Sequence, residues 1–600
     1  MTVPFALLEN ITYTHWNQTE PTLRNVSLSF GRGTLTLLAG SGGSGKSTLA
    51  SLFNGEIPHL LGGVLEGRVI VDGKDVLESR VCDLAKDVGH LFQDPESMFA
   101  TLYVEDEIAF GPENLNEEPK EILKVVDSLL EESGLTLFRR NLVWNLSGGQ
   151  IQKLSLAAVL ALKPALVVMD EPTANLDPLS TTQVHEIAVG LKEKGVTVIL
   201  ITRELDDMLL EKADQLVVLK DGGVFAASPV RELLECRGKE LLELGILLPE
   251  TVEIAVSLLG AGDNRCADLP YNARDALVEF KARGLLGPVL RGPAAAAATT
   301  ASGVDVATVA AGLAAVRGKR LISVRDLRFS YPDSGEALSA VSLDLFEGEL
   351  LAVVGRNGAG KSTLSKLLVG LLKPSGGVLE LFGKNAKAWK IHELAERVSL
   401  VFQNPEHQFL TDSVRDEIVY SLSSKGVEDP GEIKRRTDEA LDRMELGAFA
   451  ASHPFALSAG MKRRLGVATM LVGNPQVLIV DEPTYGQDAR MTRTLMAVLD
   501  EFRAKGVSIV MITHDMRLVQ EYADRVVVLN EGRIRYDGEA AKLFDHGELL
   551  AQARLRPTIL QDLLSLYQAG GGVVEGSFRK TGDFIAALEP QTVSGALNVR

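Results

Sequence analysis

The chain has 600 residues, 46% of them hydrophobic, which is enough for about four domains with well-buried cores. Its 80 acidic and 62 basic residues leave a formal charge of −18, and this excess disfavours nucleic acid as a partner because it repels a phosphate backbone. Three scattered cysteines, Cys82, Cys236 and Cys266, exclude a disulfide framework and a CxxC metal site and favour a reducing cytoplasm.

The amino terminus lacks a basic start followed by a long apolar region, so we expect no signal peptide. The chain has no run of about 18 uncharged apolar residues, and its most apolar stretches, such as Val196–Ile201 and Val507–Ile512, have the length of strands. We therefore expect a chain that does not cross a membrane by itself, although it can dock on a protein that does.

Two glycine-rich stretches have the pattern of phosphate-binding loops. GSGGSGKST follows the apolar run Leu35–Ala39, and GRNGAGKST follows Glu349–Val354 and precedes a helix-like segment. In such loops the glycines let backbone N–H groups approach phosphate oxygens, the lysine reaches the outer phosphates and the next serine ligates magnesium. Two copies in this context exclude a chance match. The predicted loop residues are Gly40, Ser41, Gly42, Gly43, Ser44, Gly45, Lys46, Ser47 and Thr48, and Gly355, Arg356, Asn357, Gly358, Ala359, Gly360, Lys361, Ser362 and Thr363.

The two loop lysines are 361 − 46 = 315 residues apart, and a similar offset recurs along the chain, as expected for a tandem duplication. The matching pairs are FQDP (92–95) and FQNP (402–405), VVMDEPT (167–173) and LIVDEPT (478–484), VILITRE (198–204) and IVMITHD (509–515), and two tails that begin at Glu243 and Ala551. We divide the chain into a first nucleotide domain (1–235), its helical tail with an alanine-rich linker (236–318), a second nucleotide domain (319–540) and its helical tail (541–600).

Within each half, short β-branched runs alternate with helical patterns, which predicts an α/β fold with a mainly parallel sheet. A more helical segment, 94–160 or 404–471, predicts an inserted helical subdomain that can grip a partner. Between the halves, GPAAAAATTASG from Gly292 is typical of a flexible connector, with a helix-forming alanine run as the alternative.

Asp481 and Glu482 follow an apolar strand, so we expect them at its carboxyl end beside the second phosphate loop. An aspartate there can hold magnesium through water, and the next carboxylate can accept a proton from the water that attacks the terminal phosphorus. An isolated DE pair would be a solvated turn. The preceding strand, the upstream loop and the second copy at Asp170 and Glu171 favour the magnesium site.

LSGGQ at Leu146–Gln150 can be a polar helix start with Ser147 as its N-cap. Together with the motifs above, however, it resembles the ATP-binding cassette ATPases over nearly the whole chain. The resemblance implies an α/β fold of two P-loop domains, each with an inserted helical subdomain and a small helical C-terminal tail. It also implies ATP and Mg²⁺ as ligands, bound between halves that pair head to tail, so that each phosphate loop meets the other half's signature.

The resemblance assigns roles residue by residue. It implies catalytic roles for Glu482, His514, Gln403 and Glu171, and metal-binding roles for Ser47, Gln93, Asp170, Ser362, Gln403 and Asp481. It implies further ATP contacts through Tyr331 and through the signature residues Ser147, Gly148, Gly149 and Gln150 in the first half and Ser458 and Gly460 in the second.

A closer resemblance comes from FQDPESMFATLYVEDEIAFGPEN at Phe92 and FQNPEHQFLTDSVRDEIVYSLSS at Phe402, which look like the energy-coupling factor importers of vitamins and transition metals. The alternative for their PE pairs is a helix start at Pro95 or Pro405. The resemblance implies an integral membrane coupling protein and a membrane substrate-binding subunit as partners, and a peripheral location on the cytoplasmic face of the membrane. Vitamin, thiamine precursor, cobalt and nickel all stay open as the transported substrate.

Departures from the family pattern predict two unequal sites. In the second signature, LSAGM, Ala459 replaces a glycine and Met461 the glutamine, while Arg203 stands where the second half has His514. His15 stands where the second half has Tyr331 opposite adenine, with Trp16 as a possible stacking substitute. Under head-to-tail pairing all four departures fall on the first site. Ala459 adds a Cβ near phosphate, and Arg203 cannot accept a hydrogen bond as neutral imidazole can. We therefore expect one proficient and one weakened ATP site.

Two rival functions remain open at this stage. One is a soluble tandem cassette ATPase that acts on ribosomes or DNA, against which stand the acidic balance and the absence of a long basic connector. The other is the ATPase of a different importer or exporter branch. Copurification with an integral membrane protein discriminates between the soluble and the membrane-bound readings.

Overall fold

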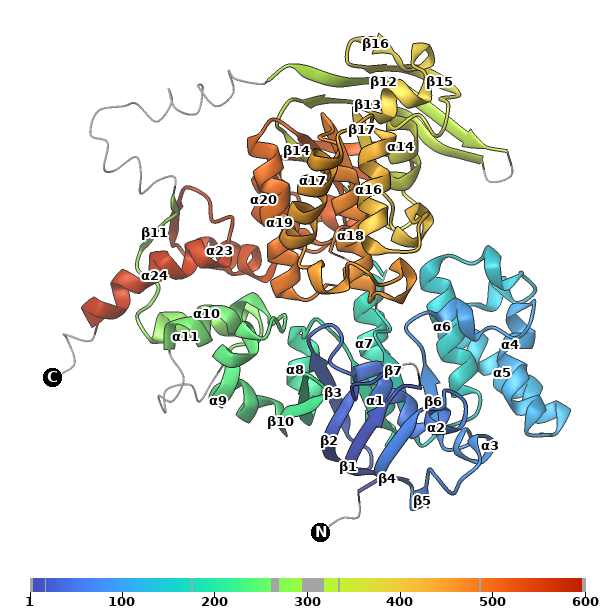
Figure 1. The fold of residues 1–600 in the computed structure, drawn as a ribbon. Helices are drawn as coiled ribbons and strands as arrows, with labels where there is room; N and C mark the ends of the chain where they lie inside the picture. The colour runs from blue at the N-terminus through green and yellow to red at the C-terminus, as the bar shows by residue number, and fades with distance from the viewer. Residues whose placement is uncertain are drawn as a thin grey trace. The chain divides into compact units, whose positions relative to one another are not determined.

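The computed structural model describes residues 4–16, 18–173, 176–259, 269–293, 318–332, 335–484 and 487–595. The chain divides into two compact units, Met1–Tyr271 and Asn272–Arg600 (Figure 1). The predicted connector from Gly292 lies almost entirely outside the described residues. The boundary after Tyr271 falls inside the predicted tail and linker segment 236–318.

The first unit is built on a six-stranded sheet with the order β10-β9-β3-β8-β7-β6. All neighbouring strands are parallel except β10, which runs antiparallel to β9. The central strands are buried along their whole length, as expected for a parallel sheet covered on both faces. The strands are β3 (Leu35–Gly40), β6 (Val88–Leu91), β7 (Leu166–Asp170), β8 (Thr197–Ile201), β9 (Gln215–Lys220) and β10 (Gly223–Pro229).

A second, antiparallel sheet of the first unit packs on this core and has the order β2-β1-β4-β5. Its apolar face shares one hydrophobic cluster with the central sheet and with helix α1. The elements around the two sheets are β1 (Ala6–Thr14), β2 (Leu23–Phe30), β4 (Val64–Val71), β5 (Lys74–Asp75), α1 (Lys46–Phe53), α2 (Glu56–His59), α3 (Val81–Leu84), α7 (Pro178–Glu193) and α8 (Asp207–Lys212).

The predicted helical subdomain is present in the first unit and has its own hydrophobic cluster. It consists of α4 (Val104–Asn114), α5 (Pro119–Ser133) and α6 (Gly148–Leu160), with the short 3₁₀ helices η1 (Pro95–Met98), η2 (Thr136–Phe138) and η3 (Val143–Asn145). The alternative interpretation of the PE pair as a helix start describes the local structure correctly, because Pro95 begins η1. The apolar positions of α5 repeat at helical spacing, so one face packs and the other stays polar.

The second unit repeats this architecture, which confirms the predicted duplication of an α/β fold with an inserted helical subdomain. Its six-stranded sheet has the order β17-β18-β19-β14-β20-β21 and its antiparallel sheet the order β13-β12-β15-β16. The strands are β12 (Arg320–Tyr331), β13 (Gly335–Phe346), β14 (Leu350–Val354), β15 (Gly376–Leu381), β16 (Lys384–Asn385), β17 (Val398–Val401), β18 (Val477–Asp481), β19 (Ser508–Ile512), β20 (Arg525–Asn530) and β21 (Arg533–Glu539).

The helices of the second unit occupy corresponding places. Those of the sheet domain are α14 (Lys361–Leu368), α15 (Ile391–Ala395), α19 (Ala489–Ala504), α20 (Met516–Tyr522) and α21 (Ala540–Leu543). Those of the helical subdomain are α16 (Val414–Ser424), α17 (Pro430–Arg443) and α18 (Ala459–Leu471), with the 3₁₀ helices η6 (Pro405–Gln408), η7 (Gly447–Phe449) and η8 (Pro454–Ala456). None of the helices in the described ranges combines the length and the apolar character of a membrane span.

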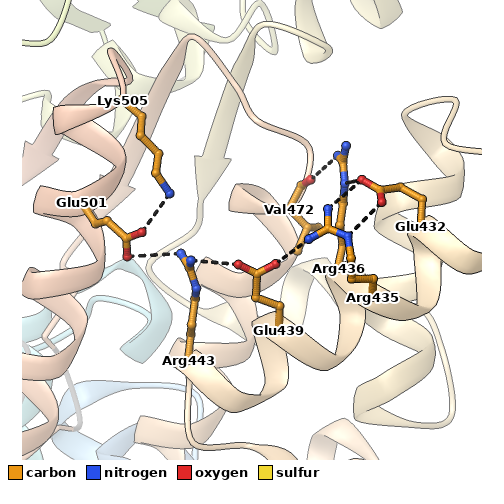
Figure 2. A network of polar contacts seen from close by, with 8 residues as sticks. All are labelled: Glu432, Arg435, Arg436, Glu439, Arg443, Val472, Glu501 and Lys505. Atoms are coloured by element: carbon orange, nitrogen blue, oxygen red, sulfur yellow. Dashed lines mark hydrogen bonds and ion pairs between the residues drawn. The ribbon is translucent and has the colours of Figure 1, made fainter.

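A chain of ion pairs links the helical subdomain of the second unit to its sheet domain (Figure 2). Arg443 on α17 contacts Glu439 at 2.8 Å and Glu501 on α19 at 3.2 Å, and Glu501 also binds Lys505 at 2.8 Å. Most of these side chains are partly exposed, so each pair contributes only about 0–1 kcal/mol. The rest of the network consists of Glu432, Arg435, Arg436 and Val472.

The helical tails contain a short parallel pairing between distant segments. β11 (Val289–Arg291) pairs with β22 (Val573–Glu575), and Arg291 binds Glu575 at 3.0 Å. The last part of the first repeat's tail therefore folds with the tail of the second repeat, inside the second unit. The tail helices are α9 (Val230–Glu243) and α10 (Glu250–Leu259) in the first unit, and α11 (Ala273–Ala282), α22 (Gly547–Gln552), α23 (Ile559–Ala569) and α24 (Thr581–Gly595) in the second.

A buried glutamate stabilises the loop before each helical subdomain. Glu417 is 3% exposed, and one of its carboxylate oxygens accepts the backbone N–H groups of Leu410 and Thr411, both at 2.5 Å. Glu107 does the same for Ala100 and Thr101 in the first unit. These residues belong to the repeated V-x-DE block, so the block has a structural function in both halves.

Replacing Glu417 with Gln should destabilise the second unit by about 1–2 kcal/mol, because the two N–H groups then meet a neutral amide oxygen, a weaker acceptor than the carboxylate. Urea unfolding followed by intrinsic fluorescence measures the change. The exposed Glu428→Gln is the control and should leave the unfolding midpoint unchanged. Equal midpoints for the two variants would contradict the structural function.

Candidate functional site

The second glycine-rich loop lies between β14 and α14, where the sequence predicts it. The Lys361 ammonium is buried and donates to the carbonyls of Gly355 at 2.6 Å and Arg356 at 3.0 Å. Gly360 has a φ of +103°, and a Cβ there would lie 2.7 Å from the Ala337 carbonyl, so only glycine fits. The loop opens directly into the N-terminus of α14, where the backbone N–H groups of the first turn and the helix dipole favour an anion.

The first loop has the same construction between β3 and α1. The Lys46 ammonium donates to the carbonyls of Gly40 at 2.8 Å and Ser41 at 3.0 Å, and Gly45 has a φ of +93°. Ser47 and Thr48 lie in the first turn of α1, as Ser362 and Thr363 do in α14. The two glycine-rich loops therefore have equivalent geometry in the two halves.

Hard oxygen donors meet beside each loop. Ser362 donates its hydroxyl to Asp481 Oδ2 at 3.0 Å, and Asp481 ends the buried strand β18. Burial raises the pKa of the Asp481 carboxyl to about 6, and the neighbouring Glu482 contributes in the same direction. Asp170 in the first unit has a pKa raised to about 6, again chiefly by burial, and its Oδ1 has no partner among the described residues. A buried carboxylate beside a hydroxyl is a donor set that fits Mg²⁺.

The next carboxylate in the second unit is held by a histidine. Glu482 Oε1 lies 2.8 Å from His514 Nδ1, and the Thr513 hydroxyl reaches Oε2 at 3.3 Å. Burial opposes ionisation of both groups, but their mutual attraction outweighs it: the pKa of Glu482 is lowered and that of His514 is raised to about 9. In this geometry the adjacent carboxylate favours the imidazolium over the neutral imidazole.

The corresponding carboxylate in the first unit has different partners. Arg203 Nε donates to Glu171 Oε1 at 2.6 Å, and Gln93 Nε2 donates to Glu171 Oε2 at 3.1 Å. Both carboxylate oxygens therefore accept bonds from within the first unit. An arginine stays protonated at all relevant pH values, so loss of a proton does not break this ion pair. A histidine, in contrast, can release its proton.

The two signatures also differ in their local structure. Ser147 is the N-cap of α6 and forms a capping box in which its backbone N–H donates to Gln150 Oε1 at 2.8 Å. Within the described residues, a Cβ on Gly148 would meet nothing within 4 Å, and one on Gly149 only the Ser180 hydroxyl at 3.7 Å. Packing inside the first unit does not explain these two glycines, whereas close approach of a ligand would.

The second signature keeps only part of this arrangement. Ser458 is the N-cap of α18 and accepts the backbone N–H of Met461 at 3.4 Å. The Met461 side chain packs against the hydrophobic core of the second unit, so it cannot return a hydrogen bond as Gln150 does. Gly460 lies in the first turn of α18, directly after Ala459.

The predicted adenine-stacking residues are placed differently in the two halves. The Tyr331 hydroxyl lies 3.2 Å from the Thr363 hydroxyl, which fixes the ring beside the second phosphate loop. His15 instead packs edge-on against Tyr13, with ring centroids 4.8 Å apart. Trp16 is 79% exposed, so it is free to stack on a ligand.

Sequence reasoning missed one residue next to the second site. Arg463 is fully buried on α18 and donates to the carbonyls of Phe402 at 2.5 Å and Asp481 at 3.1 Å, and also to that of Gln403. The only sign of this role in the sequence is a second basic residue three positions after the glycine of the signature, and basic residues are common in helices.

The chain is similar to several known proteins. The ABC transporter family model matches residues 23–174 and 338–485. A putative ABC transporter ATP-binding protein of Methanosarcina mazei is 38% identical over 554 residues, 92% of each chain. The putative HMP/thiamine import ATP-binding protein YkoD of Bacillus subtilis is 35% identical, over 94% of this chain and 96% of that one. The structure of cbiO1 from Clostridium perfringens, part of the ABC transporter complex cbiONQ, is 33% identical with a TM-score of 0.36, over 41% of this chain and 99% of that one.

Proposed function

Given that the chain belongs to the ABC transporter family and is an ATPase, we propose that it powers a membrane importer of the energy-coupling factor type, for a vitamin, a vitamin precursor or a transition-metal ion. The observation that carries the proposal is the repeated FQ-x-PE and V-x-DE block, whose buried glutamates Glu107 and Glu417 fix the same loop in both halves. The relative named for HMP/thiamine import, similar along almost its whole length, supports the same class of function.

In the proposed mechanism the second site is the proficient one. Lys361 and the loop N–H groups hold the triphosphate, while Ser362, Asp481 and Gln403 hold Mg²⁺, which neutralises phosphate charge when bound. Glu482, oriented by His514, accepts the proton of the attacking water. The first signature, Ser147 to Gln150, completes the site when the halves pair head to tail.

The first site is proposed to bind ATP but to turn it over slowly. Its loop lysine is intact, yet Glu171 is paired with Arg203, which cannot release its proton, whereas Glu482 is paired with a histidine that can. The signature that faces this site carries Met461, whose side chain is packed into the core of its own unit. Closure of the halves around two nucleotides then acts as the switch, because ATP contacts both halves only in the closed state.

The partner is proposed to dock on the helical subdomains, which expose aromatic rings at corresponding positions. Phe110 and Tyr420, each the seventh residue of its helix, are 42% and 51% exposed. Trp144 and Phe455, each two residues before its signature, are 59% and 48% exposed. Exposed aromatic side chains that recur in both copies are typical of an interaction surface.

The asymmetry is tested with one substitution in each half. Glu482→Gln should lower ATP turnover by about 10²- to 10⁴-fold, because it removes the proposed general base. Glu171→Gln should lower it much less. Steady-state phosphate release measures both, and fluorescent-nucleotide binding checks that each variant still binds ATP. Equal losses from the two substitutions would refute the asymmetry.

The role of Arg203 is tested in a variant whose second site is inactive. In a Glu482→Gln background, Arg203→His should raise the residual ATP turnover most clearly above pH 9, because a histidine paired with a carboxylate, as His514 is with a pKa of about 9, releases its proton there and frees Glu171 from the ion pair. Arg203→Lys is the matched control, since it keeps the positive charge and should give no rise. An identical residual rate in all three proteins would show that Arg203 does not limit the first site.

Association with a membrane protein tests the transport proposal. The wild-type chain should copurify with integral membrane subunits from detergent-solubilised membranes, and Phe110→Ser combined with Tyr420→Ser should weaken that association by at least about tenfold, because aromatic anchors commonly contribute more than 1 kcal/mol each. Ile391→Ser, an exposed apolar residue outside the helical subdomain, is the control and should bind normally. A wild-type chain that captures no membrane protein would favour the soluble alternative.

A further inference from the structure

Arg463 joins the signature helix of the second unit to the ends of two core strands. Its guanidinium is completely buried and donates to the backbone carbonyls of Phe402, Gln403 and Asp481. A buried cation is costly unless it is compensated, and these bonds hold both terminal nitrogens of the guanidinium in one position. The planar, multiply donating guanidinium is the side chain that can bind three such carbonyls at once.

The three carbonyls belong to the segments that carry the proposed magnesium ligands. Phe402 and Gln403 follow β17, and Asp481 is the last residue of β18. The same helix, α18, begins at the second signature with Ser458 as its N-cap. Five residues, a rise of about 7.5 Å along α18, separate Ser458 from Arg463, whose side chain reaches the backbone of the proposed magnesium site.

The first unit lacks this link. Gln152 stands at the position of Arg463, six residues after the first leucine of its signature. It is 4% exposed, and its amide nitrogen Nε2 has no hydrogen-bond partner within the described ranges. The shorter, neutral side chain thus leaves α6 without a polar tie from this position to Gln93 or Asp170.

We infer that Arg463 is a positioning residue that couples the second signature to the magnesium ligands of the second ATP site. The inference rests on the proposed function, in which Ser458 faces the nucleotide held by the first loop while Asp481 and Gln403 serve the nucleotide held by Lys361. Occupancy of the weakened first site is then transmitted along α18 to the proficient site. The weakened site acts as a regulatory site, and the route runs through the second unit.

A matched pair of substitutions in the full chain tests the positioning. Arg463→Met removes all donors and should raise the Mg²⁺ concentration for half-maximal ATP hydrolysis by about 10- to 100-fold, the usual effect of losing an outer-shell partner of a metal site. The affinity for a fluorescent ATP analogue should fall in Mg²⁺ but stay the same in EDTA, because the phosphate loop is untouched. Gln152→Met, at the corresponding position, should change neither quantity.

An unchanged Mg²⁺ requirement for Arg463→Met would overturn the inference, and so would an equal loss of nucleotide affinity in EDTA, which would indicate general distortion. If Arg463→Met does not fold, Arg463→Lys serves instead. It keeps the charge but loses the planar fork, so it should give an intermediate Mg²⁺ requirement. A requirement equal to that of the wild-type chain would contradict the role.

The coupling between the sites is tested by a double-mutant cycle. Lys46→Ala, which empties the first site, should raise the Mg²⁺ requirement of the second site in the otherwise unaltered chain, and should change it by less than about twofold when Arg463→Met is also present. Additive effects would refute the coupling. A chain that shows the coupling but never associates with a membrane protein would refute the proposed importer function and leave this inference intact.

Discussion

The common edge of the parallel sheet is the constraint on which the site depends. In the second unit β17, β18, β19 and β14 are consecutive parallel strands, so their carboxyl ends meet at one edge. Each strand delivers one element there: Gln403, the pair Asp481 and Glu482, His514, and the phosphate loop with Lys361. No long-range adjustment is needed to bring them together, because the strand order fixes it.

At this edge the two halves share a scaffold but differ in the partners of the second carboxylate and in the bonds that Arg463 makes. Both loops bury a lysine against their own carbonyls, and both aspartates have a pKa raised by burial to about 6. The second carboxylate then meets a histidine in one half and an arginine in the other. Since the protonated histidine and the arginine are both cations here, the difference lies in which of them can give up its proton, not in the charge itself.

Every feature that depends on a local sequence pattern could be predicted from the sequence. The phosphate loops, the DE pairs and the signatures occupy the predicted strand, turn and helix positions, because each motif carries its own strand–loop–helix context. Arg463 escaped prediction because its role depends on carbonyls about 60 residues upstream and 18 downstream, which no local pattern records. The pairing of β11 with β22 was missed for the same reason, since three-residue strands that meet across the chain give no periodic signal.

In a duplicated enzyme, a slow ATP site is useful only if nucleotide binding there changes the behaviour of the other site. The signature helix α18 is suited to this, because Ser458 and Ala459 at its start are exposed while Arg463, one turn later, reaches two strand ends. The wild-type arrangement needs a cation in a buried place, which is costly, and Gln152 shows that the fold accepts a neutral residue at the same position. On the proposed pairing, the second half would carry that cost because it alone transmits the state of one nucleotide to the metal ligands of the other.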